Sequence, residues 1–119
     1  IRKGLRPLEE FLVLPKATKN SEPSWFGFPI TVKADAPFSR FDLVQHIESR
    51  RIGTRQLFGG NLLRQPAYKG LPMRVAGSLT NADVVTESTF WIGVYPGLTN
   101  EIIDFMVGTI SEFVLGKTK

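Results

Sequence analysis

The residue types best suited to binding a ligand are concentrated between Gly53 and Pro66. This stretch combines glycines with two arginines, an asparagine and a glutamine, and it follows a short pattern typical of a strand. Arginine can bind phosphate oxygens through two parallel N–H donors, and amide side chains both donate to and accept from sugar hydroxyls. The composition therefore indicates a loop that surrounds a polar, anionic ligand.

Five side chains of this loop are candidates for binding a substrate, and each has a structural alternative. Arg55 and Arg64 are expected to contact phosphate or sugar oxygens, with a salt bridge as the alternative for either. Asn61 and Gln65 suit sugar hydroxyls, although an asparagine after two glycines also commonly satisfies its own backbone. The ring of Phe58 can stack on a sugar or a base, but packing in the core is favoured for it.

Several other chemistries have no support in these residues. The chain contains no cysteine, which excludes a disulfide, a thiol nucleophile and a cysteine-ligated metal within it. The single histidine, His46, cannot form a metal site alone, and a solvated or packed role is expected for it. No helix start follows Gly59 and Gly60, so this pair is neither a P-loop nor a Rossmann turn. We therefore assign no catalytic residue.

Length and composition indicate one globular domain, because the chain has 119 residues, of which 42% are hydrophobic and 22% charged. The net charge of +4 is compatible with phosphorylated small molecules, nucleic acid or acidic membranes. The basic residues are scattered and no aromatic–basic platform is visible, so nucleic acid is not the expected partner. No apolar run can span a bilayer and no signal peptide opens the chain, which predicts a cytoplasmic protein without a membrane partner.

The first part of the chain predicts a connector and then a strand. Residues 1–17 show a partial helical stripe that Pro7 breaks and Pro15 ends. Residues 25–33 alternate in the manner of a strand. Pro29 has no N–H to donate to a ladder, which favours an edge strand or a bulge there.

A helix is expected next, beginning after Ser39 and ending near Arg51. Asp42 lies three residues after the cap and can complete a capping box. Gly53 is in the position expected of a glycine at the helix C-terminus. The apolar face of this helix is assigned to Phe41, Leu43, Val44 and Ile47.

The second half predicts a helix, a strand and a last helix after the glycine-rich loop. Thr80 is expected to cap the first of these helices, with Asp83 in the return position. Residues 90–95 alternate as a strand, Thr99 starts the last helix and Gly116 ends it. The predicted fold is α+β, a small antiparallel or mixed sheet with helices packed on one face.

Three segments together carry a family resemblance: residues 23–30, residues 52–66 and residues 89–99. In their order and spacing the chain resembles, from about Phe11 to its end, the C-terminal small domain of DegT/StrS-type sugar-aminotransferase-like proteins. The more specific part is the pattern Arg-x-x-Phe-x-Gly-Asn-x-x-Arg-Gln-Pro, which is similar to that of the CDP-4-keto-6-deoxyglucose 3-dehydrases in this group. This resemblance implies the small-domain fold of fold-type I enzymes dependent on pyridoxal phosphate (PLP).

The resemblance further implies a dehydratase of deoxysugar and lipopolysaccharide O-antigen biosynthesis that works as a homodimer on a CDP-sugar. Its implied cofactors are pyridoxamine or pyridoxal 5'-phosphate and a [2Fe-2S] cluster that receives electrons from a partner reductase. The histidine, the phosphate cup and the cluster cysteines of such enzymes belong to a large domain that this chain lacks. Residues 1–17 would then be a connector helix from that large domain, and residues 18–119 the small domain, inactive alone.

Two alternatives stay open at this point. One is the small domain of a PLP-dependent nucleotide-sugar aminotransferase, and the other is a free-standing module that binds an anionic ligand. Because the chain starts at Ile1 rather than methionine, we interpret it as a piece of a longer protein. Trp25 and Trp91 are expected in the core or in a domain interface, with an apolar patch exposed where a large domain would pack.

Overall fold

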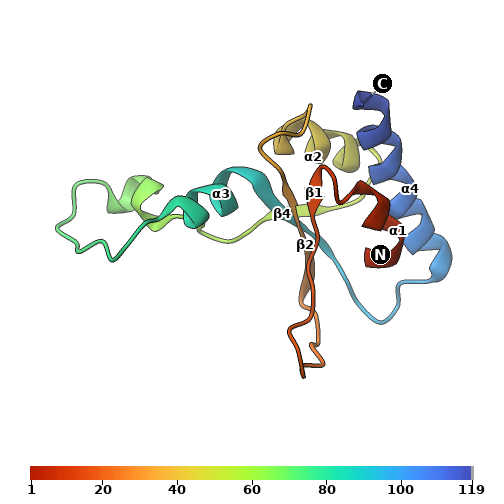
Figure 1. Cartoon of the computed structure of the whole chain (residues 1–119), viewed down its shortest axis with the longest axis horizontal. Helices are drawn as coiled ribbons and strands as arrows, with labels where there is room; N and C mark the ends of the chain where they lie inside the picture. Colours follow the sequence, from red (N-terminus) through yellow and green to blue (C-terminus); the bar gives the residue numbers. More distant parts are fainter. Residues whose placement is uncertain (119) are drawn as a thin grey trace.

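The computed structural model describes residues 1–118 and shows a four-stranded antiparallel sheet (Figure 1). The strands lie in the order β1 (Leu12–Val13), β2 (Gly27–Val32), β4 (Thr89–Gly93) and β3 (Thr54–Gln56). The helices are α1 (Arg2–Leu5), α2 (Arg40–Ser49), α3 (Thr80–Ser88) and α4 (Asn100–Lys117). Three 3-10 turns complete the secondary structure, η1 (Arg6–Leu8), η2 (Leu62–Arg64) and η3 (Pro66–Tyr68).

The core lies between one face of the sheet and the helices α1, α2 and α4 (Figure 1). In the central pair β2–β4, Ile30 is opposite Phe90 and Phe28 is opposite Ile92. All four side chains are buried, since alternate strand residues point to the same face. The predicted α+β fold with helices on one face is confirmed, and the sheet is antiparallel throughout.

The opening segment joins the same core, although only part of it is helical. Helix α1 and turn η1 end at Leu8, and the chain then pairs with the outer edge of β2 through Leu12 and Val13. Because β1 is two residues long, it has no periodic pattern to predict it, and the helical prediction was wrong there. Strand β1 stops at the level of Thr31, so β2 has only one neighbour at Pro29, as an edge position requires.

Helix α2 starts as predicted and ends differently. The side chain of Ser39 accepts from the Asp42 backbone, and the Asp42 carboxylate accepts from the Ser39 backbone, which confirms the capping box. At the other end Arg51, not Gly53, adopts the left-handed conformation, with φ of 62°. The Ile52 N–H donates to the Ile47 carbonyl, the longer bond of a Schellman motif, and the apolar contact between these two buried residues compensates for the arginine.

Two further sequence expectations about the helices were wrong. Phe41 is 67% exposed, because it lies on the side of α2 opposite the buried Leu43 and Ile47. The last helix begins after Thr99 as predicted, but it continues through Gly116 to Lys117. The buried residues Met106, Ile110 and Val114 hold α4 on the core by their four-residue spacing, so a glycine near its end does not terminate it.

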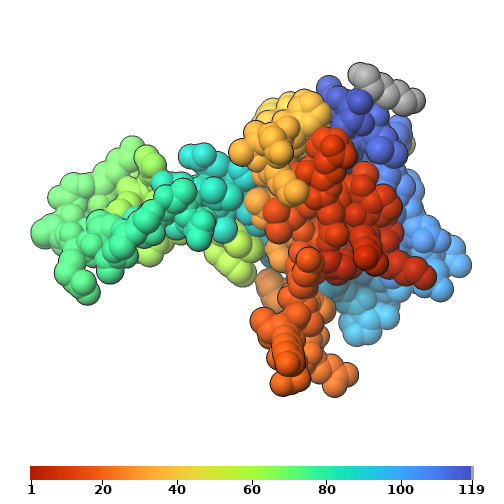
Figure 2. All heavy atoms as spheres, viewed as in Figure 1, coloured from red at the N-terminus to blue at the C-terminus, as the bar shows by residue number. Residues whose placement is uncertain are grey.

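Residues 57–88, here called the arm, project from the sheet between β3 and β4 (Figures 1 and 2). All of the arm is described by the structure, and its only buried residue is the polar Asn61. The projection makes the molecule extended: its radius of gyration is 15.9 Å, against about 13.5 Å for a compact domain of this length. The arm therefore has no apolar core of its own.

Candidate functional site

The candidate site is residues 57–65, here called the site loop, which leads from β3 into the arm. Its backbone is constrained at two positions, because Phe58 has φ of 47° and Gly60 has φ of 56°. Left-handed backbone is ordinary for glycine but strained for phenylalanine. A Cβ atom added at Gly60 would lie 2.4 Å from Oγ1 of Thr86, so this glycine also permits the close approach of the loop to α3.

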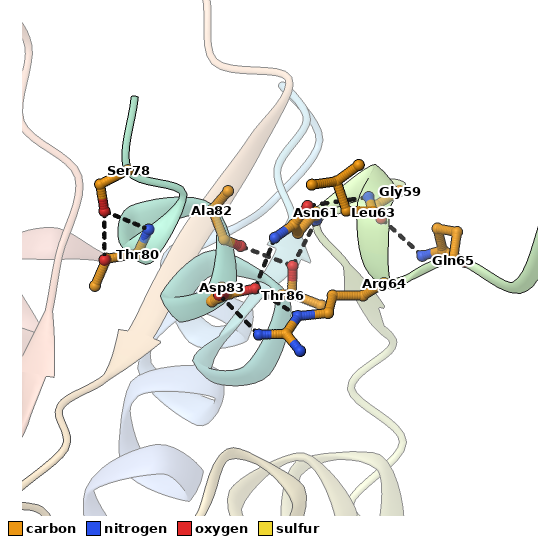
Figure 3. A network of polar contacts seen from close by, with 10 residues as sticks. All are labelled: Gly59, Asn61, Leu63, Arg64, Gln65, Ser78, Thr80, Ala82, Asp83 and Thr86. Carbon is orange, nitrogen blue, oxygen red and sulfur yellow. Dashed lines mark hydrogen bonds and ion pairs between the residues drawn. The ribbon is translucent and has the colours of Figure 1, made fainter. Parts of the chain in front are cut away.

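Asn61 lies at the centre of the site loop, and its hydrogen bonds hold the loop in place (Figure 3). It is 5% exposed, and its Nδ2 donates to Oδ1 of Asp83 at 2.7 Å. Its Oδ1 accepts from the Leu63 N–H at 3.1 Å, and its own backbone N–H donates to Oγ1 of Thr86 at 2.6 Å. Both ends of the amide are thus engaged within the protein.

Arg64 binds the same carboxylate as Asn61 (Figure 3). Its Nε donates to Oδ1 of Asp83 at 3.0 Å and its Nη2 donates to Oδ2 at 3.1 Å, a bidentate pair. The Arg64 guanidinium, followed by the Asn61 amide, lowers the pKa of Asp83, so the carboxylate stays charged well into the acid range. The guanidinium is on the surface and keeps donors that Asp83 does not use.

The other two polar candidates are less tightly engaged. Gln65 donates from Nε2 to the Gly59 carbonyl at 2.7 Å, which closes the loop and leaves its amide oxygen free of any partner in residues 1–118. Arg55 donates from Nη1 to the Thr54 carbonyl at 2.7 Å. Within the described part of the chain Arg55 has no carboxylate partner, so most of its donors face solvent.

An aromatic cluster of Trp25, Phe26, Phe58 and Trp91 lies beside the site loop, on the face of the sheet opposite the core. The ring of Phe26 stacks on that of Phe58 with centroids 6.3 Å apart and contacts Trp91 at 5.2 Å. A Cβ at Gly27 would be 2.4 Å from the Trp91 ring, so this glycine lets the indole lie on the strand. The cluster borders an apolar hollow of about 200 Å³.

The expectation that Phe58 packs in the core was wrong, since 76% of it is exposed. The left-handed backbone at Phe58 turns the ring away from the buried face of the sheet, and only Phe26 stacks against it. Phe26 itself is 74% exposed. The site loop thus presents an open aromatic surface, and Arg55 is paired with Trp91 of the same cluster across β3 and β4.

The sequence around the site loop contains basic residues but no acidic ones. Every charged side chain between Ser49 and Ala82 is an arginine or a lysine. Within residues 1–118, four of these side chains form no ion pair: Arg51, Arg55, Lys69 and Arg74. Uncompensated positive charge on a projecting arm favours an anionic ligand or surface.

The first acidic residue after this stretch is Asp83, a residue whose site role the sequence analysis missed. It was expected to complete a capping box with Thr80, but α3 has Leu79 as its N-cap and no side-chain cap. The Asp83 carboxylate instead binds Asn61 and Arg64 across 22 and 19 residues of sequence. The sequence signal that could have indicated this role is that Asp83 is the first carboxylate after a stretch whose charged residues are all basic.

The described residues contain no metal-binding cluster. Residues 1–118 contain no group of three or more His, Cys, Asp or Glu side chains placed to hold a metal ion. With no cysteine in the sequence, the chain has no ligands for an iron–sulfur cluster. His46 packs on Phe113 with ring centroids 5.2 Å apart, away from the site loop. In this part of the chain, no helix is both long and apolar enough to cross a membrane.

Comparisons with known proteins identify the relatives of this chain. The family model of the DegT/DnrJ/EryC1/StrS aminotransferases matches residues 1–111. The chain is 56% identical, over 96% of its length, to a dTDP-4-dehydro-2,6-dideoxy-D-glucose 3-dehydratase of Saccharopolyspora spinosa. It is 50% identical, over 95% of its length, to the lipopolysaccharide biosynthesis protein RfbH of Salmonella typhimurium. It spans only 24% and 26% of the length of these two curated relatives.

Solved structures agree on the fold. An aminotransferase from Psychrobacter cryohalolentis superimposes on the whole chain with a TM-score of 0.85 and 17% sequence identity. The matched part is 33% of that protein. At this identity the likeness shows a shared fold, which is the small-domain fold expected from the sequence.

Proposed function

The chain belongs to the DegT/DnrJ/EryC1/StrS aminotransferase family, and we propose that it is the C-terminal small domain of a vitamin B6-dependent nucleotide-deoxysugar 3-dehydratase. The observation that carries this proposal is an identity of 50% or more, over nearly the whole chain, to two curated relatives. One of them is named for 3-dehydratase activity and the other for lipopolysaccharide biosynthesis. Since the chain spans about a quarter of each, the activity belongs to a longer protein.

We propose CDP-4-keto-6-deoxyglucose as the substrate, in a deoxysugar pathway that serves lipopolysaccharide O-antigen. The support is the Arg-x-x-Phe-x-Gly-Asn-x-x-Arg-Gln-Pro pattern of residues 55–66 together with the Salmonella typhimurium relative. The Saccharopolyspora spinosa relative is named for a dTDP-sugar. Comparing the activity of the full-length protein on CDP- and dTDP-linked sugars therefore tests the proposed nucleotide.

The proposed roles of the five loop residues follow from their contacts. Arg55, with free donors, binds the negatively charged diphosphate, and the exposed ring of Phe58 covers an apolar face of the substrate. Gln65 offers its free amide oxygen to a sugar hydroxyl. Arg64 uses its remaining donors toward the substrate, and Asn61, which is buried and fully engaged, shapes the loop.

The cofactor chemistry is assigned to the rest of the protein. Pyridoxal or pyridoxamine 5'-phosphate, when bound there, supplies the electron sink for loss of the C3 hydroxyl, and an iron–sulfur cluster fed by a reductase supplies electrons. We assign neither group to the residues of this chain, which has no cysteine to bind a cluster. Its own contribution is to orient the nucleotide sugar and to exclude water from one side of the cleft.

We propose that the aromatic cluster packs against a large domain that is missing from this chain. The full-length protein is proposed to be a cytoplasmic homodimer. Residues 1–17 would lead into residues 18–119. Trp25, Phe26 and Trp91 would pack against the large domain, and the ring of Phe58 at the edge of the cluster would be left for the substrate. A hollow lined almost entirely by apolar side chains suits a protein surface better than a nucleotide, which needs polar groups to orient it.

An aminotransferase is the second candidate function, because the whole family and the solved relative carry that name. The visible absorption spectrum of the full-length protein, before and after dithionite, separates the two. A broad visible band that bleaches on reduction is the result expected for a dehydratase with an iron–sulfur cluster. A B6 band without bleaching would favour the aminotransferase, and absence of any chromophore would contradict both and favour a binding module.

A further inference from the structure

The position of the site loop depends on polar contacts, because the loop has no fully buried apolar side chain. The arm, residues 57–88, buries no apolar side chain, and all of it is described by the structure. Its one buried residue, Asn61, is held entirely by hydrogen bonds. Because apolar burial normally fixes a segment in place, the partners of Asn61 carry that task here.

These partners lie on one turn of α3. Asp83 and Thr86 are three residues apart and therefore share a face of the helix (Figure 3). Thr86 accepts the Asn61 backbone N–H and donates its hydroxyl proton to the Ala82 carbonyl at 2.7 Å. Asp83 accepts from two separate side chains of the loop, Asn61 and Arg64. Of the two helix residues, only Asp83 joins the loop at more than one point.

We propose that Asp83 is a positioning residue for the nucleotide-sugar site. From α3 it holds Asn61 and Arg64. Through them it fixes where the site loop presents Phe58 and Gln65 relative to Arg55 in β3. This inference rests on the proposed function, because it assigns the loop to that substrate. Asp83 does not itself touch the substrate.

The chemistry of the contacts explains why a carboxylate is required at this position. Oδ1 of Asp83 accepts from both Asn61 and Arg64, while Oδ2 accepts the second hydrogen bond of the Arg64 guanidinium. One carboxylate thus binds an amide and a bidentate guanidinium at the same time. An alanine at residue 83 would leave the nearly buried Asn61 amide without a partner, which is unfavourable. An asparagine would keep an acceptor for Asn61 but lose the charge that pairs with Arg64. Asp83→Ala should therefore disturb the site loop more than Asp83→Asn does.

Steady-state kinetics of the full-length protein with CDP-4-keto-6-deoxyglucose test the proposal. Asp83→Ala is expected to raise KM by about tenfold, the effect of losing a charge-assisted contact that orders the loop. Asp83→Asn should raise KM by less, and kcat and the B6 absorption band should change little in both. The matched control is Asp104→Asn, which removes an exposed carboxylate from α4 that has no hydrogen-bond or ion-pair partner in residues 1–118.

Hydrogen exchange of the full-length protein gives a readout that does not depend on activity. The amides of Asn61 and Leu63 donate to Thr86 and Asn61, and they should exchange faster in Asp83→Ala than in the Asp104→Asn control. Unchanged exchange would overturn the proposal, and so would faster exchange with an unchanged KM. If Asp83→Ala does not fold, Asp83→Asn decides between these outcomes. If the wild-type protein does not act on the nucleotide sugar, the proposed function fails, whereas the exchange result still tests the contact.

Discussion

Gly60→Ala is expected to displace the site loop and to raise the KM of the full-length protein for its nucleotide sugar by more than about tenfold, the consequence of misplacing substrate-positioning groups by roughly 1 Å. Two causes combine at this position. The backbone has φ of 56°, which costs an alanine about 1–2 kcal/mol. The added Cβ would also lie 2.4 Å from Oγ1 of Thr86, so either the loop or α3 has to move.

Gly70→Ala is the matched control for this substitution. Gly70 also has a positive φ, of 82°, but a Cβ added there meets no atom within 4 Å. It therefore shares the conformational cost without the collision. Equal values of KM for the two variants would show that contact between the loop and α3 does not matter for substrate binding.

Phe90→Ala is expected to lower the free energy of unfolding by about 3–5 kcal/mol, the range for removing a buried phenylalanine. Phe90 is fully buried, and it lies opposite Ile30 in the central strand pair. Its loss would open a cavity between the sheet and the helices. Urea denaturation of the chain, followed by circular dichroism, measures the change.

Phe41→Ala provides the comparison, because Phe41 is 67% exposed on α2. Removing it should change the free energy of unfolding by no more than about 0.5 kcal/mol. A similar loss of stability in both variants would mean that the core does not lie between this face of the sheet and the helices.

Most elements of the fold were predictable because their signals are local. The capping box of Ser39 and Asp42 and the cap at Thr99 each involve residues three apart, and strand alternation is visible within five residues. Strand β1 was not predictable, since its pairing with Val32 and Thr31 depends on contacts 18 to 20 residues away. The left-handed position at Arg51 likewise depends on how Ile52 packs, and no residue type at position 51 signals it.

The arrangement of the candidate loop was only partly predictable, and its role as a binding site stays a prediction. Composition alone pointed to a candidate loop around the end of β3, and the proposed roles of Arg55 and Phe58 start from there. The partner of Asn61 and Arg64 is distant in sequence, and the local capping pattern at Thr80 offered Asp83 a different role. The exposure of Phe58 follows from a left-handed backbone that is uncommon for phenylalanine, so its residue type favoured the core.

The central proposal is that this small domain serves a 3-dehydratase, and the product of the full-length protein tests it most directly. CDP-4-keto-6-deoxyglucose would be incubated with the protein, pyridoxamine 5'-phosphate, a reductase and the reduced electron donor of that reductase. The sugar would be identified by mass spectrometry and NMR. We predict a product that has lost the C3 oxygen as water and keeps its oxygen at C4. A product that carries an amino group at C4 with the C3 hydroxyl intact would contradict the proposal and identify an aminotransferase.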